Sequence, residues 1–217
     1  TTENVQIDWA KTQKWKQEQV VDRLTGGVEM LLKKNKVEII MGEAYFSDEN
    51  TVRVMGEEFG QTYTFEKAII ATGSRPVELG AFKWSDRVLD STGALALDEI
   101  PETLTVIGGG YIGSELAGVF AGLGTKVTIL EGMDSIVNGF DKDMVRLVEK
   151  EFKDNGATII TNAMAKSVEE TDTNATVTYE VNGKEETVNF EPGGELEMLL
   201  QLSDNVGEDV NYSIEWN

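Results

Sequence analysis

The sequence contains no cysteine and no histidine among its 217 residues. Without a thiol the chain can form no disulfide and no thiolate nucleophile, and without an imidazole it lacks the usual zinc ligand sets. A catalytic triad built on imidazole is excluded for the same reason. We therefore expect no metal site, and any acid–base chemistry would fall to carboxylates, lysines and tyrosines.

Basic residues are also scarce, with 19 lysines and arginines against 39 acidic residues and a formal net charge of -20. Such an acidic surface repels nucleic acid and anionic membranes, so we expect neither as a partner. No apolar run approaches the roughly 20 residues that span a bilayer, and we find no targeting pattern. These absences predict a cytoplasmic protein, and the length of 217 residues allows one large or two small domains.

The most informative stretch is residues 103–131, TLTVIGGGYIGSELAGVFAGLGTKVTILE. An apolar run at 105–107 leads into three glycines, a helical apolar pattern follows, and a second apolar run occupies 126–130. This order predicts a strand, a helix and a second parallel strand. The apolar face of the helix is predicted to comprise Ile112, Leu116, Val119, Phe120 and Leu123.

The glycines of this stretch fit the fingerprint of a dinucleotide-binding turn. Gly108 allows the sharp turn, Gly110 allows close approach of a pyrophosphate, and Gly113 lets the helix lie close to the strand. The unpaired amides at the helix start supply positive potential without a lysine. Glu131 follows roughly twenty residues later, where an acid accepts the ribose hydroxyls. No Lys or Arg lies between Glu131 and Gly139, which favours NAD over NADP; the alternative is a glycine loop without a ligand.

The rest of the chain predicts further helices and strands. Asp141 is a candidate N-cap, Asn182 and Gly183 form a strong hairpin turn, and residues 191–217 contain no Lys or Arg. Helices are predicted at 9–32, with a kink at Gly26 and Gly27, at 91–97 and at 142–155; strands are predicted at 37–40, 44–46, 51–55, 61–65, 67–71, 85–89, 157–161, 163–170, 175–181, 184–190, 196–202 and 210–216.

Three segments together resemble the bacterial dihydrolipoyl dehydrogenase family of flavoprotein disulfide reductases: AIIATGSRP at 68–76, DSTGALALDEIP at 90–101 and VIGGGYIGSELAGVFAGLGTKVTILEG at 106–132. The likeness extends from about residue 4 to about residue 188. It implies an α/β fold with a Rossmann-like dinucleotide-binding domain, a parallel sheet and a β-meander. Residues 1–80 would belong to an FAD-binding domain, 81–190 to the NAD(H)-binding domain, and 191–217 to an acidic tail unlike the family, of which 196–202 could replace the closing strand of the sheet.

The resemblance also implies which residues bind cofactor. Residues 108–115 would hold the NAD pyrophosphate and nicotinamide side, with Glu131 on the ribose and Ala165 beside the adenine. The NAD residues in 108–115 are Gly108, Gly109, Gly110, Tyr111, Ile112, Gly113, Ser114 and Glu115. The FAD contacts would be Ala44, Thr72, Gly73 and Ser74. For Glu115 a purely structural role stays open, because an acid in the first turn also suits the helix dipole.

In an intact enzyme of this family, a homodimer, dihydrolipoamide on a 2-oxoacid dehydrogenase complex is oxidised and hydride passes through FAD to NAD⁺. The redox cysteine pair, the FAD-binding glycines and the acid–base histidine of the family have no counterparts in this sequence. We therefore expect the chain alone to be inactive in the full reaction and to retain little or no FAD. The alternative is a non-catalytic nucleotide-binding or scaffold module that keeps the fold.

Overall fold

The computed structural model describes residues 6–171, 175–189 and 197–201. The chain divides into two compact units, Thr1–Gln13 with Arg75–Gly207 and Lys14–Ser74 with Glu208–Asn217. Within the described ranges, no helix combines the length and the apolar character needed to cross a lipid bilayer.

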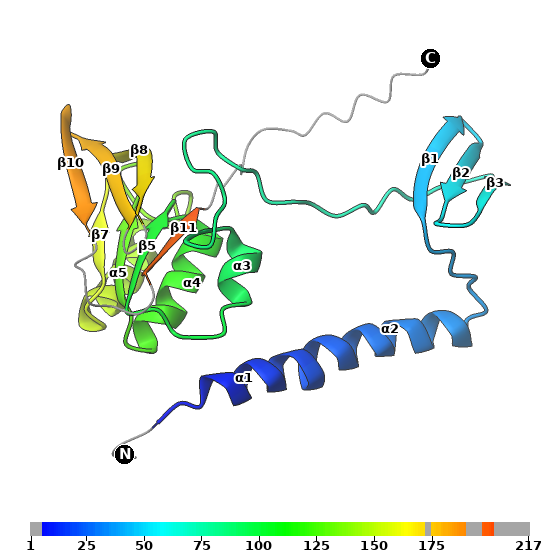
Figure 1. The fold of residues 1–217 in the computed structure, drawn as a ribbon, viewed down its shortest axis with the longest axis horizontal. Coiled ribbons are helices and arrows are strands. Elements are labelled where there is room, and N and C mark those ends of the chain that lie inside the picture. Colours follow the sequence, from blue (N-terminus) through cyan, green and yellow to red (C-terminus); the bar gives the residue numbers. More distant parts are fainter. Residues whose placement is uncertain (1–5, 172–174, 190–196, 202–217) are drawn as a thin grey trace. The chain divides into compact units, whose positions relative to one another are not determined.

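A five-stranded parallel sheet organises the first unit (Figure 1). Its strand order is β4 (Val88–Leu89), β11 (Glu197–Gln201), β5 (Thr103–Ile107), β6 (Lys126–Leu130) and β7 (Thr158–Ile160). All neighbouring pairs run parallel. The predicted strand at 196–202 is thus present, and it lies between β4 and β5 in the interior of the sheet.

Helices cover one face of this sheet, and a second sheet covers the other. The helices are α3 (Ser91–Leu95), α4 (Tyr111–Gly122) and α5 (Lys142–Asp154). The second sheet is an antiparallel meander of β8 (Ala163–Glu170), β9 (Ala175–Val181) and β10 (Lys184–Asn189). Asn182 and Gly183 form its predicted hairpin turn, both with positive φ. The predicted Rossmann-like α/β fold with a β-meander is confirmed.

The core of the unit consists of two clusters on opposite faces of the parallel sheet. Leu104 and Val106 of β5 join Phe120 of α4 in the first cluster. Ile107 joins Val177 and Tyr179 of β9 in the second. Because side chains alternate between the faces of a strand, β5 contributes to both clusters and holds the three layers together.

The buried face of α4 differs from the predicted one. Leu116 and Phe120 are buried as predicted, but Ile112 is 47 % exposed and Val119 is 53 % exposed. The sheet is instead contacted through a face rich in small residues, whose buried members are Gly113, Ser114, Leu116, Ala117, Phe120 and Ala121. Small side chains let the helix axis approach the strands. The predicted face was wrong at Ile112 and Val119 because it was derived from the large apolar residues alone.

The beginning of α1 (Trp9–Trp15) packs on the first unit. The indole Nε1 of Trp9 donates to the Leu97 carbonyl at 2.8 Å, and its ring centroid lies 6.3 Å from that of Phe120. The side-chain amide of Gln13 donates to the same Leu97 carbonyl at 2.8 Å. One end of the long N-terminal helix is therefore fixed by hydrogen bonds to the residues after α3.

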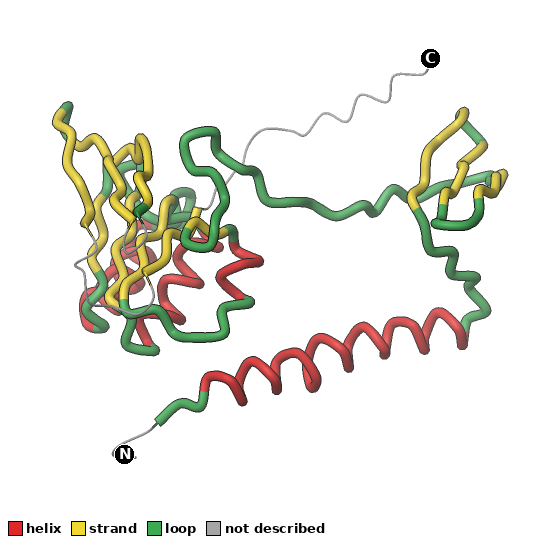
Figure 2. Tube along the Cα trace, viewed as in Figure 1, coloured by secondary structure: helices red, strands yellow, loops and turns green. Residues whose placement is uncertain are grey.

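In the second unit the same helix continues through a π-helical segment, Lys16–Val21, into α2 (Asp22–Lys34). The predicted long helix is confirmed (Figure 2). Its irregularity lies in the π-helical segment, whereas Gly26 and Gly27 lie inside α2. The unit also contains the antiparallel sheet β1 (Glu43–Asp48), β2 (Thr51–Met55) and β3 (Gly60–Thr64).

Two predicted strands of the second unit are wrong. Residues 37–40 and 67–71 form no strand, and the side chain of Ile69 is 94 % exposed. A strand of this apolar type is stable when neighbouring strands pair with it and both faces are covered. Within the described ranges no strand pairs with either segment.

Candidate dinucleotide site

A glycine turn, residues 108–110, joins the end of β5 to the start of α4. Gly108 has φ +96°, in the left-handed region that favours glycine, and its amide donates to the Leu130 carbonyl at the end of β6 at 2.9 Å. The first helical hydrogen bond runs from the Ser114 amide to the Gly110 carbonyl at 2.9 Å. The amides of Tyr111, Ile112 and Gly113 precede that bond, so they remain available to an anion such as a diphosphate.

Glu131 lies directly after β6, and its carboxylate contacts the glycine turn. One oxygen, Oε2, accepts from the Gly109 amide at 2.7 Å, and the other, Oε1, accepts from the Met133 amide at 2.6 Å. A carboxylate offers about four acceptor positions, so two amide bonds leave capacity for further donors. The structure therefore brings together the glycines and the acid that the sequence pattern singled out.

Gly109, the middle residue of the turn, has a structural role that the sequence pattern did not reveal. A Cβ at this position would lie 2.7 Å from Cγ2 of Ile136 and 3.3 Å from Oε2 of Glu131. The Gly109 carbonyl accepts from the Val137 amide at 2.7 Å and from the Ser114 hydroxyl at 3.0 Å. The amide, the carbonyl and the Cβ position of Gly109 are thus all engaged within the protein.

The loop between β6 and α5 supplies these unexpected contacts. Ile136 is 0 % exposed and belongs to the core cluster on the helix side of the sheet. Further along the loop, the ring of Phe140 packs edge-on against Tyr111, with centroids 5.4 Å apart. From the sequence, this loop was predicted only to connect a strand to a helix. The signal that the loop offered was its apolar content, Met133, Ile136, Val137 and Phe140 among glycines and polar residues.

An apolar pocket of about 390 Å³ lies between α4 and α5. Tyr111, Ser114 and Glu115 line its α4 side. The apolar wall consists of Val137, Phe140, Met144, Val145, Leu147 and Val148. Ser114 is nearly buried and its hydroxyl donates to Gly109, so that side chain stabilises the turn. Glu115 is exposed in the first turn of α4, a position compatible with either of the roles considered for it.

Ala165 is the third residue of β8, and this strand begins beside Glu131. The Ala163 amide donates to the Glu131 carbonyl at 2.9 Å, which ties β8 to the end of β6. The terminal methyl carbon Cε of the neighbouring Met164 lies 3.3 Å from where a Cβ on Gly132 would be. Ala165 follows two residues after Ala163 on the antiparallel sheet, whereas Glu131 follows a strand of the parallel sheet, and the bond of Ala163 brings the two sheets together at this point.

The four residues with predicted FAD contacts all belong to the second unit. Ala44 is an exposed residue of β1, and Thr72, Gly73 and Ser74 lie in an exposed irregular segment. Gly73 has φ +72°, which only glycine adopts easily. Thr72, Gly73 and Ser74 are consecutive residues, so they lie together because of their sequence positions alone.

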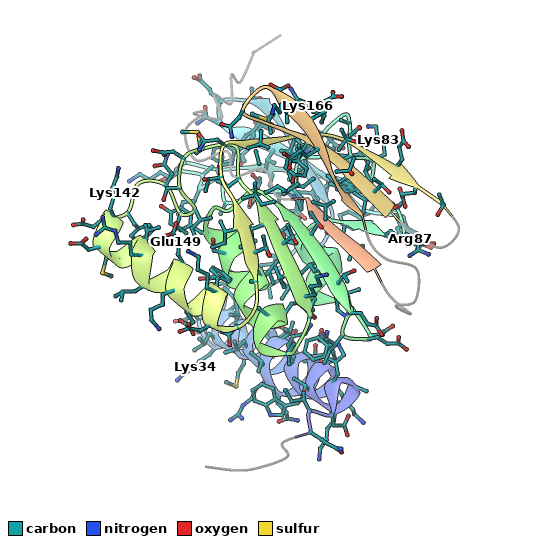
Figure 3. All side chains as sticks on the ribbon, turned by 90° about the vertical axis from the view of Figure 1, so that its left-hand side faces the viewer. Lys34, Lys83, Arg87, Lys142, Glu149 and Lys166 are labelled. Atoms are coloured by element: carbon teal, nitrogen blue, oxygen red, sulfur yellow. The ribbon has the colours of Figure 1, made fainter. Side chains whose placement is uncertain are left out.

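The charges around the turn are mainly acidic. Residues 132–139 contain no Lys or Arg, so a 2'-phosphate beside Glu131 would meet a carboxylate and no cation from that loop. Lys166 on β8 is paired with Glu180 at 3.0 Å, and Lys142 begins α5 (Figure 3). The backbone amides of α4 are therefore the main source of positive potential at the turn.

Curated relatives match most of the chain. Dihydrolipoyl dehydrogenase of Geobacillus stearothermophilus is 60 % identical over 186 residues, which is 86 % of this chain and 39 % of the relative. The enzyme of the same name from Bacillus subtilis is 60 % identical over 189 residues, 87 % of this chain and 40 % of the relative. The chain thus spans about two fifths of the length of these relatives.

Solved structures of flavoprotein disulfide reductases also resemble this chain. The HOCl-induced flavoprotein disulfide reductase RclA from Escherichia coli superposes with a TM-score of 0.75 at 29 % identity, covering 90 % of this chain and 42 % of the other. LpdA from Mycobacterium tuberculosis gives a TM-score of 0.78 at 22 % identity, with the same coverage of 90 % and 42 %, and shows the shared fold. The model of the pyridine nucleotide-disulphide oxidoreductases matches residues 2–198. The resemblance to dihydrolipoyl dehydrogenase is thereby confirmed, and the chain belongs to the pyridine nucleotide-disulphide oxidoreductase family.

Proposed function

We propose that this chain is the NAD(H)-binding region of a dihydrolipoyl dehydrogenase-like flavoprotein. The observation that carries the proposal is the contact between the glycine turn and Glu131, with a 2.7 Å hydrogen bond from the Gly109 amide to the carboxylate. A carboxylate at the tip of β6 and free amides at the start of α4 form the two halves of a dinucleotide site. Membership of the family supports the same conclusion.

Each part of the site binds a different part of the dinucleotide. The amides of Tyr111, Ile112 and Gly113 bind the diphosphate, and Glu131 accepts the adenosine ribose hydroxyls while it keeps its two amide bonds. Ala165 borders the adenine. The side chains of Tyr111 and Ile112 are both exposed, so they are accessible to the nicotinamide ring on the opposite side of the turn.

The same proposal assigns residues 1–80 to an FAD-binding domain and 81–190 to the NAD(H)-binding domain. Ala44, Thr72, Gly73 and Ser74 would contact FAD in the intact enzyme. The acidic segment 191–217 contributes β11 to the parallel sheet through Glu197–Gln201. The chain by itself holds little FAD, and a flavin absorption band in the purified protein would contradict that assignment.

In the intact homodimeric enzyme, electrons from dihydrolipoamide, presented by a 2-oxoacid dehydrogenase complex, would reach NAD⁺ through FAD. The residues of this chain bind and orient the dinucleotide for that transfer. The chain has neither a cysteine nor a histidine, so it cannot carry out the thiol steps alone. A preparation of the chain that oxidised dihydrolipoamide would contradict this part of the proposal.

The variant Glu131→Arg tests the site through its selectivity. Replacing the carboxylate by a cation removes the ribose acceptor and offers a partner to a 2'-phosphate, so calorimetric titration should show a preference moved from NAD⁺ towards NADP⁺. Glu185→Arg on β10 makes the same charge change at an exposed position and should leave the preference of the parent chain unchanged. Equal selectivity in the parent chain and in Glu131→Arg would refute the ribose assignment.

A further inference from the structure

The glycine turn packs against Ile136 and Val137, two residues that lie outside the glycine pattern. We propose that Ile136 and Val137 form a strap that sets the position of Gly109 and, through it, of the amides at the start of α4. In this view Ile136 and Val137 are positioning residues of the dinucleotide site, an inference that rests on the proposed NAD(H)-binding function. The strap touches the turn from the loop after β6, whereas the glycine pattern lies between β5 and α4.

Packing is the first observation behind the strap. The fully buried Ile136 side chain places Cγ2 2.7 Å and Cβ 3.2 Å from where a Gly109 Cβ would be. The backbone of Gly109 therefore lies directly on an isoleucine that cannot retreat into solvent. Protein interiors are close-packed, so removing the Ile136 side chain would leave the turn without support on that side.

Hydrogen bonding is the second observation. The Val137 amide donates to the Gly109 carbonyl at 2.7 Å, and the Gly109 amide donates to Glu131 at 2.7 Å. Two successive peptide groups of the turn are thus each held by a hydrogen bond to the segment that follows β6. Rotation of either would break at least one of these bonds, and the peptide group between Gly109 and Gly110 directly precedes the one that carries the Tyr111 amide offered to the diphosphate.

The backbone of Val137 is the third observation. Its φ is +41°, in the left-handed region, which is costly for a β-branched residue. Asn162 and Asn182 also have positive φ, but asparagine tolerates that conformation. Such a conformation persists at Val137 because the hydrogen bond to Gly109 and the burial of Ile136 hold it there, as is typical of segments that shape functional sites.

The strap also reaches the first residue of α4. The Phe140 amide donates to the Val137 carbonyl at 3.3 Å, and the Phe140 ring packs against Tyr111. One continuous loop therefore contacts the middle of the glycine turn and the residue whose amide opens the helix. The same segment therefore contacts Gly109, two residues before the diphosphate-binding amides, and Tyr111, which carries the first of them.

The test compares Ile136→Ala with Leu104→Ala, which removes the same number of carbons from the same core cluster. Leu104 lies near the start of β5, at the opposite end of that strand from the glycine turn. Both variants should melt at lower temperature. At a temperature where both remain folded, Ile136→Ala should weaken NADH binding by at least about tenfold, because the turn amides are misplaced, whereas Leu104→Ala should stay within about twofold of the parent chain. Ile136→Val keeps a branched Cβ against Gly109, so its NADH affinity should match that of the parent chain. This variant provides the comparison with the parent chain if Ile136→Ala fails to fold.

A double-mutant cycle tests the strap without any nucleotide. Gly109→Ala and Ile136→Ala should each lower the melting temperature, and the double variant should lose less than the sum of the two single losses, because Ile136→Ala removes the methyl group that the new Cβ meets. Additive losses would overturn the packing contact, and equal NADH affinities for Ile136→Ala and Leu104→Ala would overturn the positioning role. If the parent chain binds no NADH, the proposed function fails, but the cycle still decides whether Ile136 supports Gly109.

Discussion

Gly109 and Glu131, 22 residues apart in the sequence, are joined by a 2.7 Å hydrogen bond from the glycine amide to the carboxylate Oε2. This bond connects the turn after β5 to the tip of β6, the next strand in the sheet. Glu131 therefore belongs to the architecture of the turn as well as to the proposed ribose contact. Substitutions at Glu131 should affect stability and nucleotide binding together. The two effects can be separated by measuring the free energy of unfolding and the nucleotide affinity of the same variant.

Glu131→Gln should destabilise the protein modestly. A glutamine amide has one acceptor oxygen, so it can serve only one of the amides of Gly109 and Met133, and the other loses its partner. The expected loss in the free energy of unfolding is about 1–2 kcal/mol, measured by urea denaturation. Glu185→Gln on the exposed face of β10 is the control and should have little effect. Equal unfolding midpoints for the parent chain and Glu131→Gln would show that the carboxylate does not support the turn.

Gly109→Ala and Gly118→Ala should change stability in opposite directions. At Gly109 the added Cβ would meet Ile136 at 2.7 Å, and overpacking of this kind costs about 1–3 kcal/mol. At Gly118, inside α4, the nearest atom would be a ring carbon of Phe152 at 3.8 Å, which is ordinary contact. Alanine there should stabilise the helix by about 0.5–1 kcal/mol. Thermal melts of the two variants measure the difference, and a stabilising Gly109→Ala would contradict the described turn.

Leu199→Pro should severely destabilise the first unit. Residue 199 pairs with Val88 of β4 on one side and Thr105 of β5 on the other, and proline removes an amide from the middle of the sheet. The expected loss is about 3 kcal/mol or more, at the high end for a single substitution. Leu199→Val keeps the amide and a side chain suited to strands, so it should be far milder. If circular dichroism melts of the two variants coincide, β11 does not occupy the interior of the sheet.

Alkaline stability should depend on Tyr179. Burial raises the pKa of this phenol, and its hydrogen bond to Glu186 Oε2 at 3.0 Å raises it further. An unfolded tyrosine titrates near about pH 10, so the contribution of Tyr179 is fully present below that pH and is lost as pH rises through the higher folded pKa. The stability difference between the parent chain and Tyr179→Phe should therefore shrink above about pH 10. Melting temperatures of both proteins across this range would show it, and a constant difference would rule it out.

Local sequence signals predicted much of the first unit correctly. The apolar run at 126–130 became β6 with the same bounds, and the Asn182–Gly183 pair became a hairpin turn because both residues accept positive φ. The glycine turn and Glu131 were also recognisable, since their spacing in the sequence follows from the geometry of one strand–helix–strand unit. In these cases the structure depends on neighbours that are close in the chain.

The errors concern contacts that no local pattern encodes. Residues 67–71 have the composition of a buried strand, but a strand also requires partners, and the described structure pairs none with that segment. Ile112 and Val119 fitted an apolar stripe, yet the small residues of α4 set which face meets the sheet. The contacts of Ile136 and Val137 with Gly109 could not be found because they join two loops, one after each of two adjacent strands.

The most direct test of the account is a titration of NADH with the purified chain, followed by the fluorescence of the reduced nicotinamide. The account predicts a saturable change in NADH emission that NAD⁺ reverses by competition, because the turn amides and Glu131 are already arranged as a dinucleotide site. NADH fluorescence that stays the same over the whole range of protein concentration would contradict it, and would leave this chain with the fold of its family but without the proposed binding function.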